Sequence, residues 1–133
     1  TKDRYSACPT IRYLDGAYYM VYLERLEQWY FAPQWVRSKD LRDWELSPLN
    51  PMMTPGPADK QVANPELTDA ERAHIKGAKD INNSDVDFCG FRGKTIISYS
   101  WGSQRGTEFL AEAVYNGPEA AFLRAWFPGG EDE

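Results

Sequence analysis

The residues of this sequence that are best suited to chemistry are carboxylates that stand near large aromatic side chains. The set consists of Glu24, Asp85, Asp87 and Glu108 with the tryptophans Trp29 and Trp101. Asp85 and Asp87 alternate in a strand-like run, so both side chains should lie on the same side of that strand. Carboxylates bind paired hydroxyl groups or transfer protons, and an indole ring stacks on the apolar face of a ligand. These residue types therefore favour a site for a polyhydroxylated ligand.

Each carboxylate also has a structural interpretation, and the sequence leaves both interpretations open. Asp85 follows Asn82-Asn83-Ser84 and could cap a turn. Asp87 could accept hydrogen bonds from backbone amides, and Glu108 could be an ordinary carboxylate at the edge of a strand.

Charge and composition argue against several other classes of function. The 133 residues carry 20 acidic and 15 basic side chains, a net charge of −5, and no basic run contains interleaved aromatic residues. Binding to nucleic acid or to an anionic membrane is therefore not expected. No apolar run reaches the roughly 20 residues that a membrane span requires. With one His and two Cys the sequence lacks the ligands of a zinc site, and we expect no metal and no cofactor.

The two cysteines, Cys8 and Cys89, lie in apolar strand-like runs far apart in the sequence. We expect two buried free thiols and no disulfide. Free thiols fit a reducing compartment and no secretory leader is visible, so we expect a cytoplasmic protein. A sequence that begins at Thr1 without Met is also compatible with a leader already removed, which leaves export open.

The N-terminal third of the sequence has the pattern of a β-meander. Asp15-Gly16 is a hairpin turn pair between two apolar strands, expected at about 8–14 and 17–24. The second strand is apolar on both faces, as for a strand buried between two layers. A third strand follows, in which Pro33 indicates a bulge or an edge position, and a short fourth strand is expected around 44–46.

A Pro- and Gly-rich connection comes next and contains one predicted helix. Thr68 and Glu71 form a capping box and Gly77 is placed to end the helix, so we expect it over residues 69–76. The single histidine, His74, falls in this helix and fits a solvated surface position.

The strand pattern then repeats at an offset of 77 residues. Aligning Gly16 with Gly93 places Tyr22 on Tyr99, so that a strand, a tight Gly turn and a second strand recur. A third strand is expected at about 108–115.

The sequence ends in a predicted helix with one apolar stripe. Pro118 suits the first helical turn, and the stripe consists of Phe122, Leu123, Trp126 and Phe127. A helix with such a stripe should pack against another part of the protein.

The sequence resembles the glycosidase five-bladed β-propellers, the superfamily of glycoside hydrolase families 43, 32 and 68, in the stretches ACPTIRYLDGAYYMVYLE, VRSKDLRDWE and NNSDVDF…GKTIISYSWGSQRGTEFLAEAVYNGP. The resemblance covers nearly the whole chain, and its most specific part is the RS-KDL-x-x-W run that closes a blade. It implies an all-β fold built of propeller blades: two four-stranded antiparallel meanders with a short inserted helix and a C-terminal helix. Residues 1–133 would form a partial propeller domain, with blades at about 7–47 and 84–115, a linker and helix at 48–83, and the C-terminal helix at 118–127.

The resemblance also implies where a site should lie. In such propellers the active face carries the entries to the first strands and the loops between the second and third strands. Four segments are thereby placed on one rim: 4–8, 24–29, 82–87 and 101–108. The catalytic candidates are Asp85, Glu24 and Glu108, and the substrate-binding candidates are Arg4, Asp87, Trp29, Trp101, Gln104 and Arg105.

Part of the catalytic set of these hydrolases is missing from this sequence. The general base of the resembled families comes from the first blade, which the chain does not include. The general acid is often a Glu before an Ala-Pro pair, whereas the corresponding stretch here, Ser6-Ala7-Cys8-Pro9, has no carboxylate. We therefore expect the isolated chain to be inactive.

Three functions follow from the resemblance. The chain could be part of a glycoside hydrolase-like propeller that hydrolyses glycosidic bonds when complete, or a non-catalytic carbohydrate-binding or scaffold module. A mannoside phosphorylase-type propeller is the third, with Arg4, Arg25 and Arg105 as a basic phosphate site. In each case the expected partner is a carbohydrate. The apolar faces of two isolated blades should be covered by self-association or by the remaining blades of a longer chain.

Overall fold

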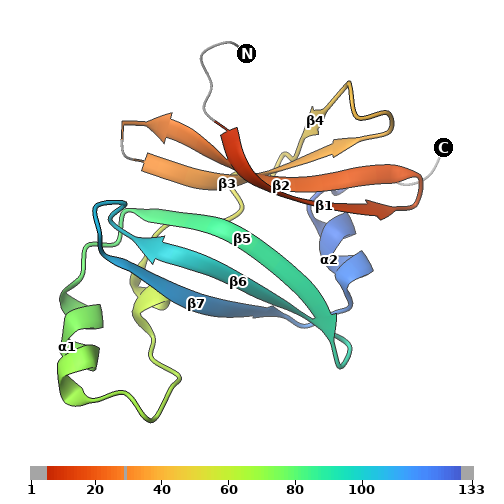
Figure 1. Cartoon of the computed structure of the whole chain (residues 1–133). Coiled ribbons are helices and arrows are strands. Elements are labelled where there is room, and N and C mark those ends of the chain that lie inside the picture. Colours follow the sequence, from red (N-terminus) through yellow and green to blue (C-terminus); the bar gives the residue numbers. More distant parts are fainter. Residues whose placement is uncertain (1–5, 29, 130–133) are drawn as a thin grey trace.

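The computed structural model describes residues 6–28 and 30–129 and is an all-β structure of two antiparallel sheets with short helices (Figure 1). The first sheet contains, in order, β1 (Ser6–Leu14), β2 (Ala17–Glu27), β3 (Tyr30–Ser38) and β4 (Glu45–Leu46). The second sheet contains, in order, β5 (Asn82–Phe91), β6 (Lys94–Gly102) and β7 (Glu108–Tyr115). The helices are the 3₁₀-helix η1 (Pro57–Lys60) and the α-helices α1 (Asp69–Gly77) and α2 (Glu119–Ala125). Both sheets are open, and the described residues form no closed ring.

Both sheets begin with the same hairpin, which confirms the repeat predicted from the sequence. Asp15 and Gly16 have φ angles of 51° and 76°, and their equivalents Arg92 and Gly93 have φ angles of 50° and 75°. Positive φ at both central residues is the mark of a type I′ turn, whose twist matches that of the paired strands. The repeat therefore extends from residue types to backbone geometry.

A β-bulge recurs at the equivalent place in the first strand of each sheet. In β1 and β5 alike, two residues lie opposite a single tyrosine of the partner strand. The first of the two is Cys8 in β1, with φ 50°, and Asp85 in β5, with φ 53°. A left-handed residue in a bulge bends the strand and re-aims its side chain, so the same local device is built twice.

The prediction of two four-stranded meanders is wrong for the second sheet, which has three strands. After β7 the chain turns, and α2 begins directly after Pro118, where a fourth strand would follow. The apolar stripe explains this outcome, because the helix buries Phe122, Leu123 and Phe127 to 5% exposure or less. Alternating strand geometry would place neighbouring members of that stripe on opposite faces.

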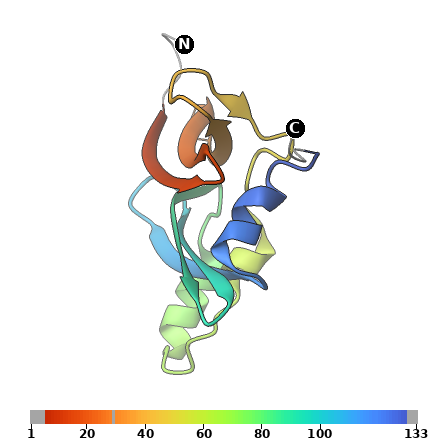
Figure 2. The same cartoon turned by 90° about the vertical axis from the view of Figure 1, so that its right-hand side faces the viewer.

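The two sheets meet mainly through β5, which lies against β1, β2 and β3, while β6 and β7 lie progressively farther from the first sheet (Figures 1 and 2). The contact is thus made mainly by one strand of the second sheet. Helix α2 fills part of the wedge between the sheets. The ring of Phe122 lies 5.8 Å from that of Trp35 in β3 and 5.5 Å from that of Phe88 in β5.

The central strand β2 is apolar on both faces, as predicted. Its face toward the second sheet is buried and comprises Ala17, Tyr19, Val21 and Leu23. Its opposite face comprises Tyr18, Met20 and Tyr22, which are half-buried. Pro33 of β3 pairs with Leu23 of β2 on one side and lies beyond the two residues that pair with β4 on the other, where its carbonyl accepts a hydrogen bond from Met52 N (2.8 Å) of the linker.

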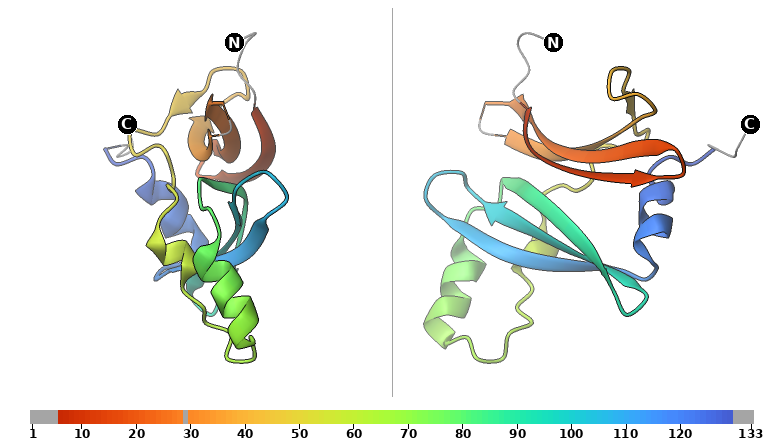
Figure 3. Two further views of the ribbon diagram at one scale, coloured as in Figure 1. Left: turned by 90° about the vertical axis from the view of Figure 1, so that its left-hand side faces the viewer. Right: turned by 45° about the vertical axis from the view of Figure 1, so that its right-hand side comes forward.

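The linker packs on the second sheet, with α1 on the side of that sheet far from the first (Figure 3). The capping box of α1 is confirmed: Glu71 N donates to Thr68 Oγ1 (3.3 Å) and Thr68 N donates to Glu71 Oε2 (2.7 Å). The helix was predicted to stop at residue 76, before Gly77, but Gly77 is itself helical. The chain becomes extended at Ala78, with φ −66°.

Among residues 6–28 and 30–129, no helix combines the length and the apolarity that crossing a membrane would need. Within the same residues, no group of three or more His, Cys, Asp or Glu side chains is arranged to hold a metal ion.

Candidate functional site

The starts of β1 and β5 and the loop between β6 and β7 lie toward the same end of the two sheets. The β1–β2 turn and the β5–β6 turn lie at the opposite end (Figure 1). A set of side chains from these three segments is in contact, and we call it the rim cluster. It consists of Cys8, Ser84, Asp85, Gln104 and Glu108. Three of these residues, Asp85, Gln104 and Glu108, were site candidates from the sequence.

A chain of hydrogen bonds connects the rim cluster. The thiol of Cys8 is within hydrogen-bonding reach of the carboxylate of Asp85. Ser84 Oγ donates to Asp85 Oδ2 (3.1 Å) and accepts from Gln104 Nε2 (3.4 Å). Gln104 N in turn donates to Glu108 Oε1 (2.6 Å). The starts of both first strands and the β6–β7 loop are thereby held to one another.

The backbone around the rim cluster adopts several uncommon conformations. Cys8, Asp85 and Gln104 have φ angles of 50°, 53° and 56°. Residues other than Gly adopt this left-handed backbone conformation only at a cost in free energy. In the same loop, Gly102 has φ 152°, and a Cβ added there would lie 2.1 Å from the carbonyl oxygen of Thr107. Only Gly fits this position. Strained residues of this kind collect where a fold must aim particular side chains.

The thiol of Cys8 favours its protonated form, which can donate a hydrogen bond to Asp85. The hydrogen bond to Asp85, followed by partial burial and the negative charge of Asp85, raises the pKa of Cys8 to about 11. Cys8 and Cys89 are both unpaired, as predicted, but both are exposed, so the expectation of buried thiols is wrong. The bulge at Cys8 interrupts the alternation of β1, and Cys89 lies on the outward side of β5.

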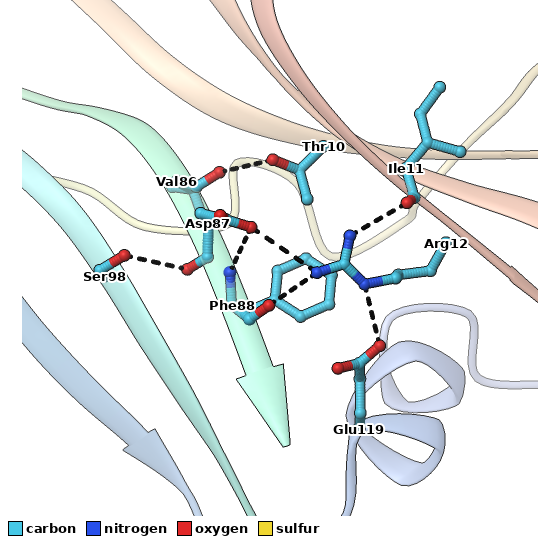
Figure 4. Close-up of polar contacts among 8 residues, drawn as sticks. All are labelled: Thr10, Ile11, Arg12, Val86, Asp87, Phe88, Ser98 and Glu119. Atoms are coloured by element: carbon cyan, nitrogen blue, oxygen red, sulfur yellow. Dashed lines mark hydrogen bonds and ion pairs between the residues drawn. The ribbon is translucent and has the colours of Figure 1, made fainter. Parts of the chain in front are cut away.

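Asp87 lies outside the rim cluster, although it is two residues from Asp85. Its Oδ1 accepts a hydrogen bond from Phe88 N (2.8 Å) and lies 3.7 Å from Arg12 Nη2 of the first sheet (Figure 4). In this structure Asp87 makes contacts of the structural kind that the sequence left open.

Arg12 is a residue that sequence reasoning missed. Its Nη2 donates to the carbonyl of Phe88 (2.8 Å), its Nε donates to Glu119 Oε1 of α2 (3.0 Å), and its guanidinium lies 4.7 Å from the centre of the Phe88 ring (Figure 4). Thr10 Oγ1 similarly donates to the carbonyl of Val86 (3.0 Å). Side chains of β1 thus satisfy carbonyls of β5. A basic residue inside the apolar run CPTIRYL was the signal that could have pointed to it.

Glu24 occupies a different position from the one expected. Strand β2 continues to Glu27, so Glu24 is paired with Ser6 and Ala32 inside the sheet and is only 3% exposed. Its Oε2 accepts a hydrogen bond from Tyr22 Oη (3.3 Å). It borders a hollow of about 390 Å³ on the outer face of the first sheet, lined by Ser6, Ala7, Pro9, Met20, Tyr22, Glu24, Val36 and Trp44. The resemblance implied that Glu24 lies on a loop, whereas the structure places it within strand β2.

Trp101 is also placed differently from its expectation. It lies in β6, is 2% exposed and stacks on Phe109 with ring centres 4.7 Å apart, which makes it part of the core. Arg105 is exposed in the β6–β7 loop, as expected for a rim residue. The candidates Arg4 and Trp29 lie outside the described residues.

Comparison with known proteins gives a likeness of fold. No family model matches the sequence, and no curated protein matches it. A solved structure named as a complex of BT0996 and RGII is similar, with a TM-score of 0.57 and 13% sequence identity. The match covers 88% of this protein and 34% of the BT0996 chain, so this protein spans about a third of the length of its structural neighbour. At this level of identity the likeness concerns the fold.

Proposed function

We propose that this chain supplies two blades of a glycosidase-type five-bladed propeller and that its rim cluster forms part of a carbohydrate site. In the complete protein the site would hydrolyse glycosidic bonds. The fold likeness supports this proposal, because the neighbouring structure is a complex with RGII, a carbohydrate. The resemblance of the sequence to glycosidase propellers points the same way.

The observation that carries the proposal is the meeting of the two equivalent bulges with the β6–β7 loop. Together they place the exposed carboxylate of Asp85 and the half-buried primary amide of Gln104 in one hydrogen-bonded group, joined by the buried hydroxyl of Ser84. Vicinal hydroxyls of a sugar ring both donate and accept hydrogen bonds, so a mixed set of this kind suits them. Asp85 is the exposed carboxylate at the centre of the set and is the residue we assign to substrate hydroxyls or to proton transfer.

A second candidate, a binding module without turnover, is favoured by the position of Glu24. Hydrolysis requires an acid and a base on either side of the glycosidic bond. Glu24 is buried in β2, and Ala7 stands where the resembled family often has its acid. Because each of these groups contributes about 10² to 10⁴-fold to the rate, the isolated chain should not hydrolyse aryl glycosides at a robust rate.

The test is titration of the purified chain with oligosaccharides released from RGII, followed by amide chemical shifts. We expect shifts at residues of the rim cluster, and Asp85→Asn should weaken binding by about tenfold or more, as expected for loss of a charged hydrogen-bond acceptor. Glu112→Gln is the matched control, since Glu112 is an exposed carboxylate in the middle of β7. Shifts confined to other surfaces, or equal affinity of the Asp85→Asn variant, would contradict the proposal. Turnover that disappears in Asp85→Asn would instead make Asp85 catalytic.

A further inference from the structure

Two carboxyl groups lie side by side between the linker and the second sheet, away from the surface of the rim. Asp59 belongs to η1, and Asp80 comes just before β5. Gly56 N lies 3.1 Å from Oδ2 of each residue and donates to both. The shared donor brings the two carboxyl groups together, and each affects the pKa of the other. A hydrogen bond between two carboxyl groups requires a proton on one of them, because two carboxylates at this distance repel.

Asp59 is the charged member of the pair. Its Oδ1 accepts a hydrogen bond from Tyr99 Oη of β6 (2.6 Å), and its Oδ2 accepts from Asn83 Nδ2 of β5 (3.0 Å). Burial acts in the opposite direction, but the hydrogen bonds from Tyr99, Asn83 and Gly56 hold the pKa of Asp59 below its usual value. Burial and the nearby Asp59 raise the pKa of Tyr99, which therefore remains a donor.

Asp80 is the member of the pair that binds a proton more readily. Burial, followed by the hydrogen bond with Asp59 and the charge of Asp59, raises the pKa of Asp80 to about 6, against the opposing effects of Gly56 N–H and Lys60. Lys60 is engaged elsewhere, since its Nζ donates to the carbonyls of Ala78 (2.6 Å) and Lys76 (3.3 Å). The Oδ1 atom of Asp80 is buried and has no hydrogen-bond partner among the described residues.

We propose that Asp59 and Asp80 share one proton and form a pH-sensitive lock that holds the linker and the start of β5 against β6. In the closed lock the Asp80 O–H donates to the Asp59 carboxylate, which also binds Tyr99 and Asn83. When the proton passes to solvent, two carboxylates face each other with Gly56 N–H as their common donor, and their repulsion weakens the attachment of η1, which Tyr99 and Asn83 still hold through Asp59. Asn83 directly precedes Ser84 of the rim cluster, so the lock positions that segment. The lock itself does not depend on whether the rim binds sugar.

The direction of the pH effect follows from the linkage between protonation and folding. The pKa of Asp80 is higher in the folded chain than in the unfolded chain, so its stabilising effect is present at low pH and is lost as the pH rises through about 6. Asp59, with a lowered pKa, stays charged throughout this range. For a shift of this size, the folding equilibrium constant should fall by up to about tenfold between about pH 5 and pH 8.

The experiment combines NMR with denaturant unfolding of the whole chain. Carboxyl ¹³C shifts should reveal one Asp that titrates near pH 6 in the wild-type chain, and this signal should be absent in Asp80→Asn. The Asn amide still donates to Asp59, so this variant should unfold with little pH dependence over the same range and should be more stable than the wild type at about pH 8. Glu112→Gln should keep the wild-type pH dependence.

Amide hydrogen exchange, corrected for its intrinsic pH dependence, locates the effect. In the wild type, the protection of residues 56–60 and 80–83 should decrease as the pH rises, and in Asp80→Asn it should not. The proposal is overturned if every Asp of the wild type titrates below about pH 5, or if Asp80→Asn keeps the wild-type pH dependence. If Asp80→Asn does not fold, the wild-type titration decides alone.

Discussion

The seam between the sheets is the contact that Arg12 of β1 makes with Phe88 of β5 and Glu119 of α2. Replacing Arg12 by Met tests how strongly this seam contributes to stability. Met keeps most of the apolar stem but removes the guanidinium and with it the contacts to Ile11, Asp87, Phe88 and Glu119. The hydrogen bond to the Phe88 carbonyl (2.8 Å) is charge-assisted and worth about 1.5 to 3 kcal/mol. The ion pair with Glu119, between side chains 35% and 29% exposed, adds about 0.2 to 1 kcal/mol. The contact with the Phe88 ring adds about 0.5 to 1 kcal/mol. Because such terms overlap, we expect a loss of about 2 to 4 kcal/mol.

The assay is urea unfolding followed by Trp fluorescence, and the matched control is Arg124→Met. Arg124 forms an ion pair with Asp15 at 2.6 Å, shorter than that of Arg12 with Glu119, but the two side chains are 56% and 49% exposed. Exposed pairs contribute little, so this variant should lose less than about 1 kcal/mol. Equal losses in Arg12→Met and Arg124→Met would refute the reasoning, since the seam would then be no stronger than a surface contact.

Two further predictions concern packing. Phe122→Ala should cost about 3 to 5 kcal/mol, because Phe122 is 4% exposed among aromatic rings of both sheets, whereas Leu110→Ala, at a residue 81% exposed, should change the unfolding midpoint little. Light scattering should show that the purified chain self-associates, because the outer face of the first sheet displays Tyr13 (64% exposed) and Ile11 (44% exposed) beside the half-buried Met20. A monodisperse monomer that binds no hydrophobic dye would show that this face is stable in water.

Local signals in the sequence predicted the strands and turns well. The Asp-Gly pair at 15–16 fixes its turn through positive φ, and the Thr68–Glu71 capping box begins α1 where expected. Both depend on interactions within a few residues, which a sequence displays directly. The C-terminal helix was also predicted from its apolar stripe, whereas the four strands expected for the second sheet came from the resemblance, and the structure has three.

The site was only partly predictable, since its contacts join residues far apart in the sequence. Asp85 and Gln104, both site candidates from the sequence, lie close together through Ser84, but the partnership of Asp85 with Cys8 arises only when the two bulges meet. Glu24 and Trp101 were assigned to loops because the sequence does not show where a strand ends. Strand β2 continues past Glu24 to Glu27 and β6 past Trp101 to Gly102, and both side chains are buried.

The paired bulges separate the shape of the backbone from the chemical identity of the side chain that it presents. Cys8 and Asp85 occupy the same left-handed position in two copies of one supersecondary unit, yet one is a neutral thiol and the other a carboxylate. A duplicated unit that keeps its bulge can therefore exchange the residue at this position without redesigning the surrounding strand. Each copy can then present a different functional group at this position. A mixed binding surface can evolve by single substitutions at one structurally fixed position in each copy.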